Sequence, residues 1–202
     1  MFYSTDRNDH GLPHDPFKAI VAPRPIGWIS CMAANGAVNL SPYSFFNAFA
    51  SRPPIVGFSS EGMKDAVSFI AETHEFVCNL ATWDLRDAMN ATSAPLPRGV
   101  SEFAHAGLEQ EASQMVRAPR IKGIPTALEC RLVEIKQLQT STGMKIENWL
   151  VLGEVVGVHI DDRYIHGGRF DITAARPIAR CGYADYAVVN EVFSIVRPPG
   201  AG

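Results

Sequence analysis

Long apolar runs are missing from this sequence. No stretch approaches the ~20 consecutive apolar residues that a membrane-spanning helix needs, which excludes a helical membrane protein. Residues 1–10 are polar and lack the basic flank and apolar segment of a secretory signal. We therefore expect a cytoplasmic protein with no membrane partner.

An excess of positive charge is also missing. The chain carries 18 Lys and Arg against 21 Asp and Glu, a net charge of -3 at pH 7. This balance gives no sequence-wide attraction to nucleic acid or to acidic membranes, so we expect no nucleic-acid partner. Any phosphate group that the protein binds must be held by a local site.

The sequence has few cysteines and no metal-binding spacing among them. Cys31, Cys78, Cys130 and Cys181 form no C-x-x-C pair and have no histidine at ligand spacing, so we expect no metal site. We predict free thiols that pack as small apolar side chains. The patterns G-x-x-x-x-G-K and G-x-G-x-x-G are absent as well, which excludes the two phosphate-binding loops that they define.

Repeats and low-complexity tracts are absent too, and the body of the chain is continuous. Its 202 residues suffice for one large domain, and 47% apolar with 19% charged residues is an ordinary globular balance. We predict an N-terminal arm at 1–16, a single domain at 17–196 and a short tail at 197–202.

Strand patterns dominate what is present. Apolar runs at 26–33 and 37–40 flank Asn35-Gly36, a dipeptide typical of a tight hairpin turn. Runs rich in Val, Ile and Leu predict further strands at 55–59, 76–80, 127–140 and 149–161. The prolines of 52–54 argue against regular pairing before the strand at 55–59.

Helical patterns are few. Apolar residues at helical spacing predict a helix at 64–73, and Asp84 is placed to cap a second one. Residues 94–125 are rich in Pro, Gly and Ala, which predicts a loop with short helical turns and a candidate lid. Long antiparallel strands with few helices predict a mainly β fold with peripheral helices, as a barrel that closes its own edges.

The first candidate binding segment is Ala22-Pro-Arg-Pro-Ile-Gly-Trp-Ile-Ser30. Pro23 and Pro25 fix φ on both sides of Arg24 and so present its guanidinium stiffly. A guanidinium held in this way suits a planar or phosphate-bearing ligand. A surface turn with a solvated arginine is the alternative for this segment.

The second candidate segment is Asn39-Leu-Ser-Pro-Tyr-Ser-Phe-Phe-Asn47, which combines small hydroxyl residues, two amides and adjacent aromatic rings. A flavin ring needs hydrogen-bond donors along its pyrimidine edge and apolar surface against its xylene end. We expect backbone N–H groups of residues 44–47 to bond flavin N5 and O4. The alternative is that Phe45, Phe46 and Phe49 are core residues, and we expect this of at least one of them.

The third candidate segment suits a phosphate monoester. Ser59-Ser60 precedes a glycine loop, and Lys64-Asp65 opens the predicted helix. Hydroxyls and first-turn N–H groups donate, while Lys64 neutralises charge. Such a Lys-Asp pair is more often solvated surface, so the pattern gains weight only beside the two earlier segments.

These segments, with Pro53-Pro-Ile-Val-Gly-Phe-Ser59 and Phe76-Val-Cys-Asn-Leu80, resemble the flavin reductase-like (flavoredoxin-type) family. The similarity continues through Gly153-Glu-Val-Val-Gly-Val-His-Ile160 and covers most of residues 17–186. That family implies an antiparallel FMN-binding split β-barrel, a homodimer, and one FMN per subunit near the subunit interface.

The resemblance also implies roles for single residues. Arg24, Ser59 and Lys64 would contact the phosphate or the ribityl chain of FMN, and Asp65 and Ser68 would be further cofactor contacts. The residues that would hold the flavin ring, largely through backbone groups, are Ser41, Ser44, Phe45, Phe46 and Asn47.

The C-terminal part adds candidates for a substrate or interface role. His166, Arg169 and Asp171 lie in a polar loop that could approach the flavin or the nicotinamide, with a solvated loop as the alternative. Arg180 and Tyr183 resemble the C-terminal Arg and aromatic positions of the family, where docking across the dimer is expected.

A bound FMN would carry the chemistry, so no catalytic side chain is predicted. We expect an oxidoreductase that accepts hydride from NAD(P)H on the flavin and passes electrons to free flavin, another small acceptor or a protein partner such as an oxygenase. Two alternatives stay open: an FMN carrier or electron-transfer module without NAD(P)H turnover, and a barrel that serves only as an interaction domain.

Overall fold

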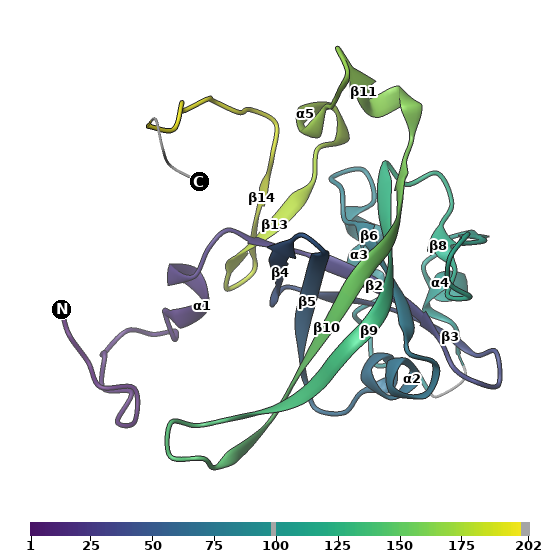
Figure 1. The fold of residues 1–202 in the computed structure, drawn as a ribbon. Coiled ribbons are helices and arrows are strands. Elements are labelled where there is room, and N and C mark those ends of the chain that lie inside the picture. Colours follow the sequence, from purple (N-terminus) through teal and green to yellow (C-terminus); the bar gives the residue numbers. More distant parts are fainter. Residues whose placement is uncertain (98–99, 199–202) are drawn as a thin grey trace.

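A seven-stranded antiparallel sheet forms the body of the molecule in a computed structural model that describes residues 1–97 and 100–198 (Figure 1). In the order in which they pair, its strands are β3 (Val38–Tyr43), β2 (Gly27–Met32), β6 (Glu75–Leu80), β9 (Thr126–Gln139), β10 (Lys145–Ile160), β5 (Pro54–Glu61) and β4 (Phe46–Ser51). The predicted antiparallel, mainly β fold is confirmed. Residues 98–99 of the predicted loop and 199–202 of the predicted tail lie outside the described residues.

Smaller elements surround this sheet. A three-stranded sheet contains β1 (Arg24–Pro25), β13 (Ile178–Gly182) and β14 (Asp185–Val188). Two short hairpins pair β7 (Gln110–Glu111) with β8 (Arg120–Ile121) and β11 (Ile165–His166) with β12 (Arg169–Phe170). The helices are α1 (Phe17–Ile20), α2 (Asp65–Thr73), α3 (Arg86–Ala91), α4 (Glu102–His105) and α5 (Ile172–Ala175), with a 3₁₀ turn at Asp162–Tyr164.

The sheet curls so that its two edge strands are joined at one end. Strands β3 and β4 are the opposite edges of the seven-stranded order, yet in the chain they are separated only by Ser44 and Phe45. Across this junction the ring of Tyr43 on β3 lies 4.5 Å from the ring of Phe58 on β5, centroid to centroid. We call the Ser44–Phe45 bend the seam of the barrel.

Both faces of the sheet are covered by apolar side chains. Strand β2 shows this directly, because it is buried continuously instead of in alternation. Trp28 packs with Phe103 in one cluster, whereas Ile29 packs with Phe76 and Ile70 of α2 in the other. A fully buried side chain of this size stabilises the fold by roughly 1.5–3 kcal/mol.

The segment predicted as a lid is part of the core. Phe103, Val116 and Ile121 are 1%, 8% and 1% exposed, and they belong to the cluster around Trp28. Opening this segment would expose these side chains to water, so the interpretation as a lid is wrong. The segment at 94–125 has weak periodicity because it contains short elements, such as α4 and β8, that each place a single large apolar side chain in the core.

The predicted hairpin and the first helix are confirmed. Strands β2 and β3 pair across Asn35-Gly36, and Gly36 takes a φ of +88°, which glycine adopts at little cost. Helix α2 begins at Asp65, one residue after the predicted start.

Two local predictions are wrong. Asp84 does not cap α3, since the N-cap residue is Leu85 and the Asp84 carboxylate lies 3.4 Å from the Arg176 guanidinium. Pairing also begins before Ile55, because Ser51 is opposite Pro54. Pro54 is the first residue of β5, beyond the end of the pairing with β10, and a proline without an N–H group is tolerated at that position.

The cysteines are free thiols, as predicted, and Cys31, Cys78 and Cys130 are buried while Cys181 is half-buried. Burial raises the pKa of the Cys31 thiol, which keeps it protonated and unreactive. Within residues 1–97 and 100–198, no group of three or more His, Cys, Asp and Glu could hold a metal ion. In the same part of the chain, no helix is long and apolar enough to cross a membrane.

Candidate functional site

Three adjoining cavities meet at Ser44 on the seam, and we call them together the central cleft. The largest, about 770 Å³, is lined by residues next to α1, β1 and the β13–β14 hairpin. A second, about 190 Å³, contains Ser59 and Lys64, and a third, about 480 Å³, contains Phe49. The largest cavity falls in the range of roughly 300–1,000 Å³ that small-molecule sites occupy.

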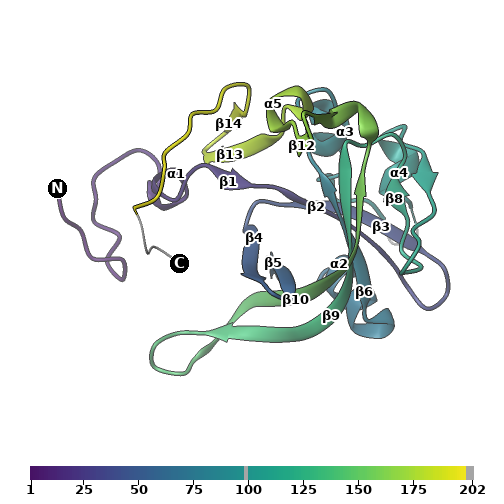
Figure 2. The same cartoon turned by 45° about the horizontal axis from the view of Figure 1, so that its top comes forward.

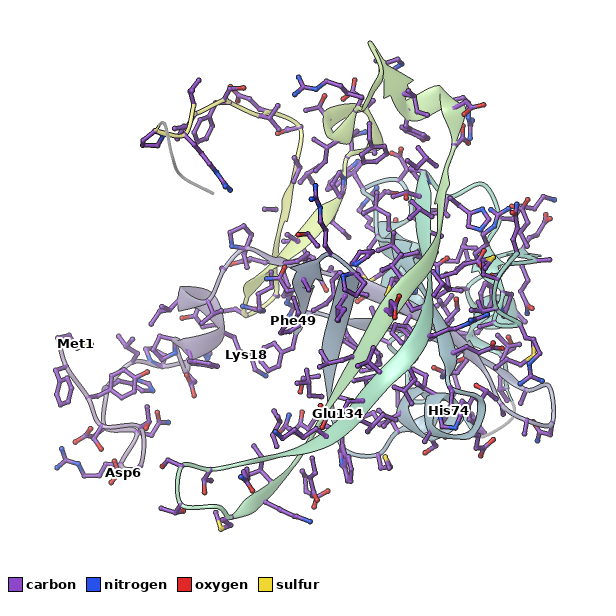
Figure 3. The ribbon with its side chains drawn as sticks, in the orientation of Figure 1. Met1, Asp6, Lys18, Phe49, His74 and Glu134 are labelled. Carbon is purple, nitrogen blue, oxygen red and sulfur yellow. The ribbon has the colours of Figure 1, made fainter. Side chains whose placement is uncertain are left out.

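The figures show why these segments lie together. Figure 2 shows α1, β1 and β13 gathered on one side of the barrel, near β4. Figure 3 labels Lys18 on α1 and Phe49 on β4, which belong to different cavities of the central cleft. Strand β1 pairs with β13 through Arg24 and Arg180, so the start and the end of the domain build one wall.

The seam is fixed by a backbone contact to β5. The carbonyl of Phe45 accepts a hydrogen bond of 2.8 Å from the N–H of Ser59. Phe45 remains 38% exposed, so its ring forms part of the surface of the cleft. The bend therefore presents Ser44 and Phe45 to a ligand from a rigid support.

Ser59 provides an unused hydrogen-bond donor. Its Oγ is buried and has no partner, whereas the hydroxyl of neighbouring Ser60 donates to the Gly62 carbonyl at 3.0 Å. A buried polar group left unpaired costs about 1–3 kcal/mol. Ser59 lines two of the three cavities, so a ligand in the cleft can satisfy this hydroxyl.

Two lysines face the smallest cavity. Lys64 is the N-cap residue of α2 and Lys18 lies on α1. Within the described part of the chain, no carboxylate lies within 4.0 Å of either ammonium. Glu61 lines the same cavity and is exposed. The cavity thus carries one net positive charge and suits an anion.

Arg24 is nearly buried, with 7% of its surface exposed. Its Nη1 donates to the backbone carbonyls of Lys18 and Val21, and its Nε is buried without a partner. The guanidinium carbon lies 5.7 Å from the centroid of the Phe45 ring. Arg24 therefore lines the cleft, with Nη1 bonded to carbonyls of Lys18 and Val21 and with Nε free to donate.

The other residues predicted to hold the ring divide into two groups. Phe46 and Asn47 line the third cavity, together with Phe49. Of the three phenylalanines, Phe46 packs against the core, whereas Phe49 is 58% exposed. Ser41 is already engaged, since its hydroxyl donates to the Asn39 side-chain carbonyl at 3.2 Å.

Two of the predicted cofactor contacts, Asp65 and Ser68, lie elsewhere. Asp65 lines a separate cavity of about 380 Å³ that also contains Glu102. Burial raises the pKa of Glu102, although hydrogen bonds from Leu40 N–H and Asn39 oppose the shift. The Ser68 hydroxyl donates to the Met63 carbonyl at 3.4 Å. The structure does not bring these two side chains to the central cleft.

The predicted polar loop forms the β11–β12 hairpin, away from the residues that line the cleft. His166 pairs with Arg169 across this hairpin, and its ring nitrogen lies 2.9 Å from the Asp171 carboxylate. Hydrogen bonds from the Thr173 hydroxyl, His166 and the Ala174 N–H hold the pKa of Asp171 well below its usual range. Asp171 also accepts from the Thr173 N–H, so two backbone N–H groups at the start of α5 donate to it. Arg180, in contrast, lines the largest cavity.

Several lining residues escaped the sequence analysis. Polar examples are Lys18, Asn90, Asn148 and Tyr186. Asp15-Pro16 is a sequence signal for the start of α1, and the Asp15 carboxylate accepts a 2.8 Å hydrogen bond from the Phe17 N–H. That signal predicts the helix but does not place Lys18 at the cleft.

The chain belongs to the flavin reductase-like family, since the model of the flavin reductase like domain matches residues 21–172. This confirms the resemblance seen in the sequence.

The relatives agree with this assignment. An uncharacterized protein of Halalkalibacterium halodurans is 32% identical, with 88% of this chain and 87% of that protein covered. Nitrilotriacetate monooxygenase component B from Bacillus cereus has a similar structure, with a TM-score of 0.86, 26% identity, and 96% and 98% of the two chains covered. A putative flavin reductase with a split barrel domain from Shewanella frigidimarina has a TM-score of 0.85 at 21% identity, covering 98% and 100%. The fold is therefore a split barrel, as predicted.

Proposed function

We propose that the central cleft binds FMN and that the protein is an oxidoreductase that takes hydride from NAD(P)H and passes electrons to free flavin, another small acceptor or a protein partner. The observation that carries this proposal is the unpartnered Oγ of Ser59, buried beside Lys64 and next to the seam. Membership of the flavin reductase-like family supports the choice of a flavin over other phosphate esters.

The phosphate and ribityl chain would occupy the smallest cavity. There Ser59 donates a hydrogen bond from its hydroxyl, and Lys64 compensates the phosphate charge. The N-cap residue Lys64 makes no side-chain hydrogen bond to the first turn of α2. The N–H groups of that turn would therefore be further hydrogen-bond donors for the phosphate.

The flavin ring would lie along the seam. The Ser44–Phe45 bend supplies backbone groups to the polar edge of the ring, and Phe45, Phe46 and Phe49 supply apolar surface. FMN, when bound, supplies the two-electron redox chemistry, so the side chains need only bind, orient and exclude water. The large cavity beside Arg180 and the β13–β14 hairpin leaves room for a reductant or an acceptor.

We also propose that the protein is a homodimer with the cleft near the interface. Apolar side chains on α1 and β4 support this, because Phe17, Ile20, Val21 and Phe49 are 55%, 71%, 48% and 58% exposed. Large apolar side chains gathered on one surface mark an interaction site. Sedimentation velocity should give twice the monomer mass, and a monomer at micromolar concentration would contradict the proposal.

One experiment tests the main proposal. Purified protein is mixed with FMN, free flavin is removed, and the absorbance of retained flavin is recorded before and after anaerobic addition of NADH or NADPH. We expect retained flavin that bleaches with one or both nucleotides. Absence of retained flavin would contradict FMN binding, and retained flavin that does not bleach would favour the carrier without NAD(P)H turnover. Riboflavin is the matched control, and we expect it to bind more weakly because it lacks the phosphate.

A further inference from the structure

We propose that Lys18 is a second cation for the phosphate of the cofactor, and that Arg24 is the positioning residue that holds Lys18 in place. This inference rests on the proposed FMN site. It assigns a binding role to a segment outside the family match, which begins at residue 21, whereas α1 ends at Ile20.

Arg24 fastens α1 to the barrel. Its Nη1 donates to the carbonyl of Lys18 inside α1 and to the carbonyl of Val21 directly after it. A helix of four residues has too few internal hydrogen bonds to be stable alone, so these contacts decide where α1 lies. The bonds from Arg24 satisfy carbonyls that a short helix leaves unpaired at its end.

A glycine on β13 also packs closely against α1. Gly182 has a φ of +97°, and a Cβ at this position would lie 2.6 Å from the Cα of Ala19. The backbones of α1 and β13 can approach this closely only because residue 182 has no side chain. Arg24 and Gly182 thus fix Ala19 and its neighbour Lys18 against the small sheet, whose strands β1 and β13 pair with each other.

This placement brings the side chain of Lys18 to the phosphate cavity. Lys18 lines the smallest cavity with Ser59 and Lys64, and it also lines the largest one. Among residues 1–97 and 100–198 its ammonium has no carboxylate within 4.0 Å. A phosphate monoester carries a charge of roughly −1.5 to −2 at pH 7, which a single lysine does not neutralise. Two lysines beside one exposed Glu61 fit such a group better than Lys64 with Glu61, whose charges cancel.

Arg24 itself is poorly placed to hold the phosphate with Nη1. That nitrogen already donates to two backbone carbonyls, and the residue is 7% exposed. Moving the guanidinium toward a ligand would leave these carbonyls unpaired and release α1. Nη1 of Arg24 therefore acts on phosphate binding through Lys18, whereas the buried Nε, which has no partner, remains available to a ligand in the cleft.

The test compares FMN with riboflavin, which differs by the phosphate. Dissociation constants are measured from the change in flavin fluorescence for the wild type, Lys18→Gln and the matched control Lys145→Gln on the exposed start of β10. We expect Lys18→Gln to weaken FMN binding about tenfold, equivalent to about 1.4 kcal/mol, with riboflavin binding within about twofold of wild type. The Lys145→Gln control should change neither.

A double-mutant cycle tests the role of Arg24. If Arg24 acts through Lys18, Arg24→Ala should also weaken FMN binding, and adding Arg24→Ala to Lys18→Gln should change it by less than about twofold. Gly182→Ala should displace α1 while residue 24 remains arginine, and it should weaken FMN binding more than riboflavin binding. This variant provides a second test if Arg24→Ala does not fold.

The outcomes separate the two proposals. Unchanged FMN affinity in Lys18→Gln would overturn the assignment of Lys18 while the FMN site stands. Losses that multiply in the double mutant would overturn the positioning role of Arg24. A wild type that binds neither FMN nor riboflavin would overturn the proposed function, and this inference with it.

Discussion

The carboxylate of Glu129 on β9 pairs with the imidazole of His159 on β10. Glu129 is fully buried. It also accepts hydrogen bonds from the N–H groups of Gln114, Met115 and Val116, at 2.8, 2.5 and 3.1 Å. Burial raises the pKa of Glu129, but these bonds from Gln114, His159 and Met115 outweigh it, and the net pKa is lowered. One side chain thus ties the segment after β7 to the wall of the barrel.

Glu129→Gln should destabilise the fold. The amide retains the shape of the carboxylate but loses the charge and replaces one acceptor oxygen with a donor that faces N–H groups. We expect the free energy of unfolding to fall by about 3 kcal/mol at pH 7, measured by urea denaturation. Glu134→Gln on the exposed part of the same strand is the control and should leave stability nearly unchanged.

The effect of Glu129→Gln should depend on pH. A folded-state pKa below the unfolded value of about 4.3 means that the carboxylate contributes stability above that pH and loses it as the pH falls through the folded pKa. The difference between wild type and variant should therefore be present above that pH and shrink as the pH falls below it. A difference that grows below pH ~4 would contradict the lowered pKa.

Gly153→Ala should disturb the core under β10. A Cβ at this position would lie 2.4 Å from the Phe76 ring and 3.2 Å from the Cys130 Cβ, and both side chains are fully buried. We expect a loss of about 1–3 kcal/mol in the free energy of unfolding. Gly157→Ala is the control on the same strand. The atom nearest to a Cβ at this position would be Cγ of the flexible Met115 side chain, at 3.3 Å. Equal melting temperatures for the two variants would argue against this packing.

Ser59→Ala should separate binding from stability. Removing an unpartnered buried hydroxyl costs no hydrogen bond, so we expect unchanged or slightly higher stability without ligand. FMN affinity should fall about tenfold, because a donor to the cofactor is lost. Thermal unfolding with and without FMN measures both quantities. A variant that melts earlier without FMN but binds it as the wild type does would assign Ser59 a structural role instead.

The paired change His166→Ala with Arg169→Ala should leave FMN binding unchanged. Both residues lie on the β11–β12 hairpin, and His166 interacts with Asp171 at the start of α5. Flavin fluorescence titration of the double variant should give an affinity within about twofold of wild type. A loss of tenfold or more would show that this hairpin reaches the cofactor.

Strand and helix periodicity predicted much of the fold. The apolar runs at 26–33, 127–140 and 149–161 correspond to β2, β9 and β10. Strand β2 is buried almost throughout, whereas β9 and β10 mix buried and exposed positions, and their Val, Ile and Leu content is typical of strands. The loop at 94–125 was misjudged for the opposite reason. Its apolar residues are spaced by neither a helical nor a strand period, although Phe103 and Ile121 are both 1% exposed.

The candidate site was predicted in part. Two separate sequence segments supplied candidates that line the same cavity: Ser44 and Phe45 from one, and Ser59 and Lys64 from the other. Lys18 could not be found in this way, because its position depends on a long-range contact of Arg24 and on Gly182. Such contacts join parts of the chain that no local pattern connects.

The seam also couples the two edge strands of the sheet, β3 and β4. Strands β3 and β4 end the pairing order on opposite sides, and the Ser44–Phe45 bend is their covalent hinge. A small molecule seated at this bend would brace both edge strands at once, so its departure would loosen amides on β3 and β4 together, including those that it never touches. Binding in the central cleft would then slow amide hydrogen exchange in both β3 and β4, although these two strands are not hydrogen-bonded to each other.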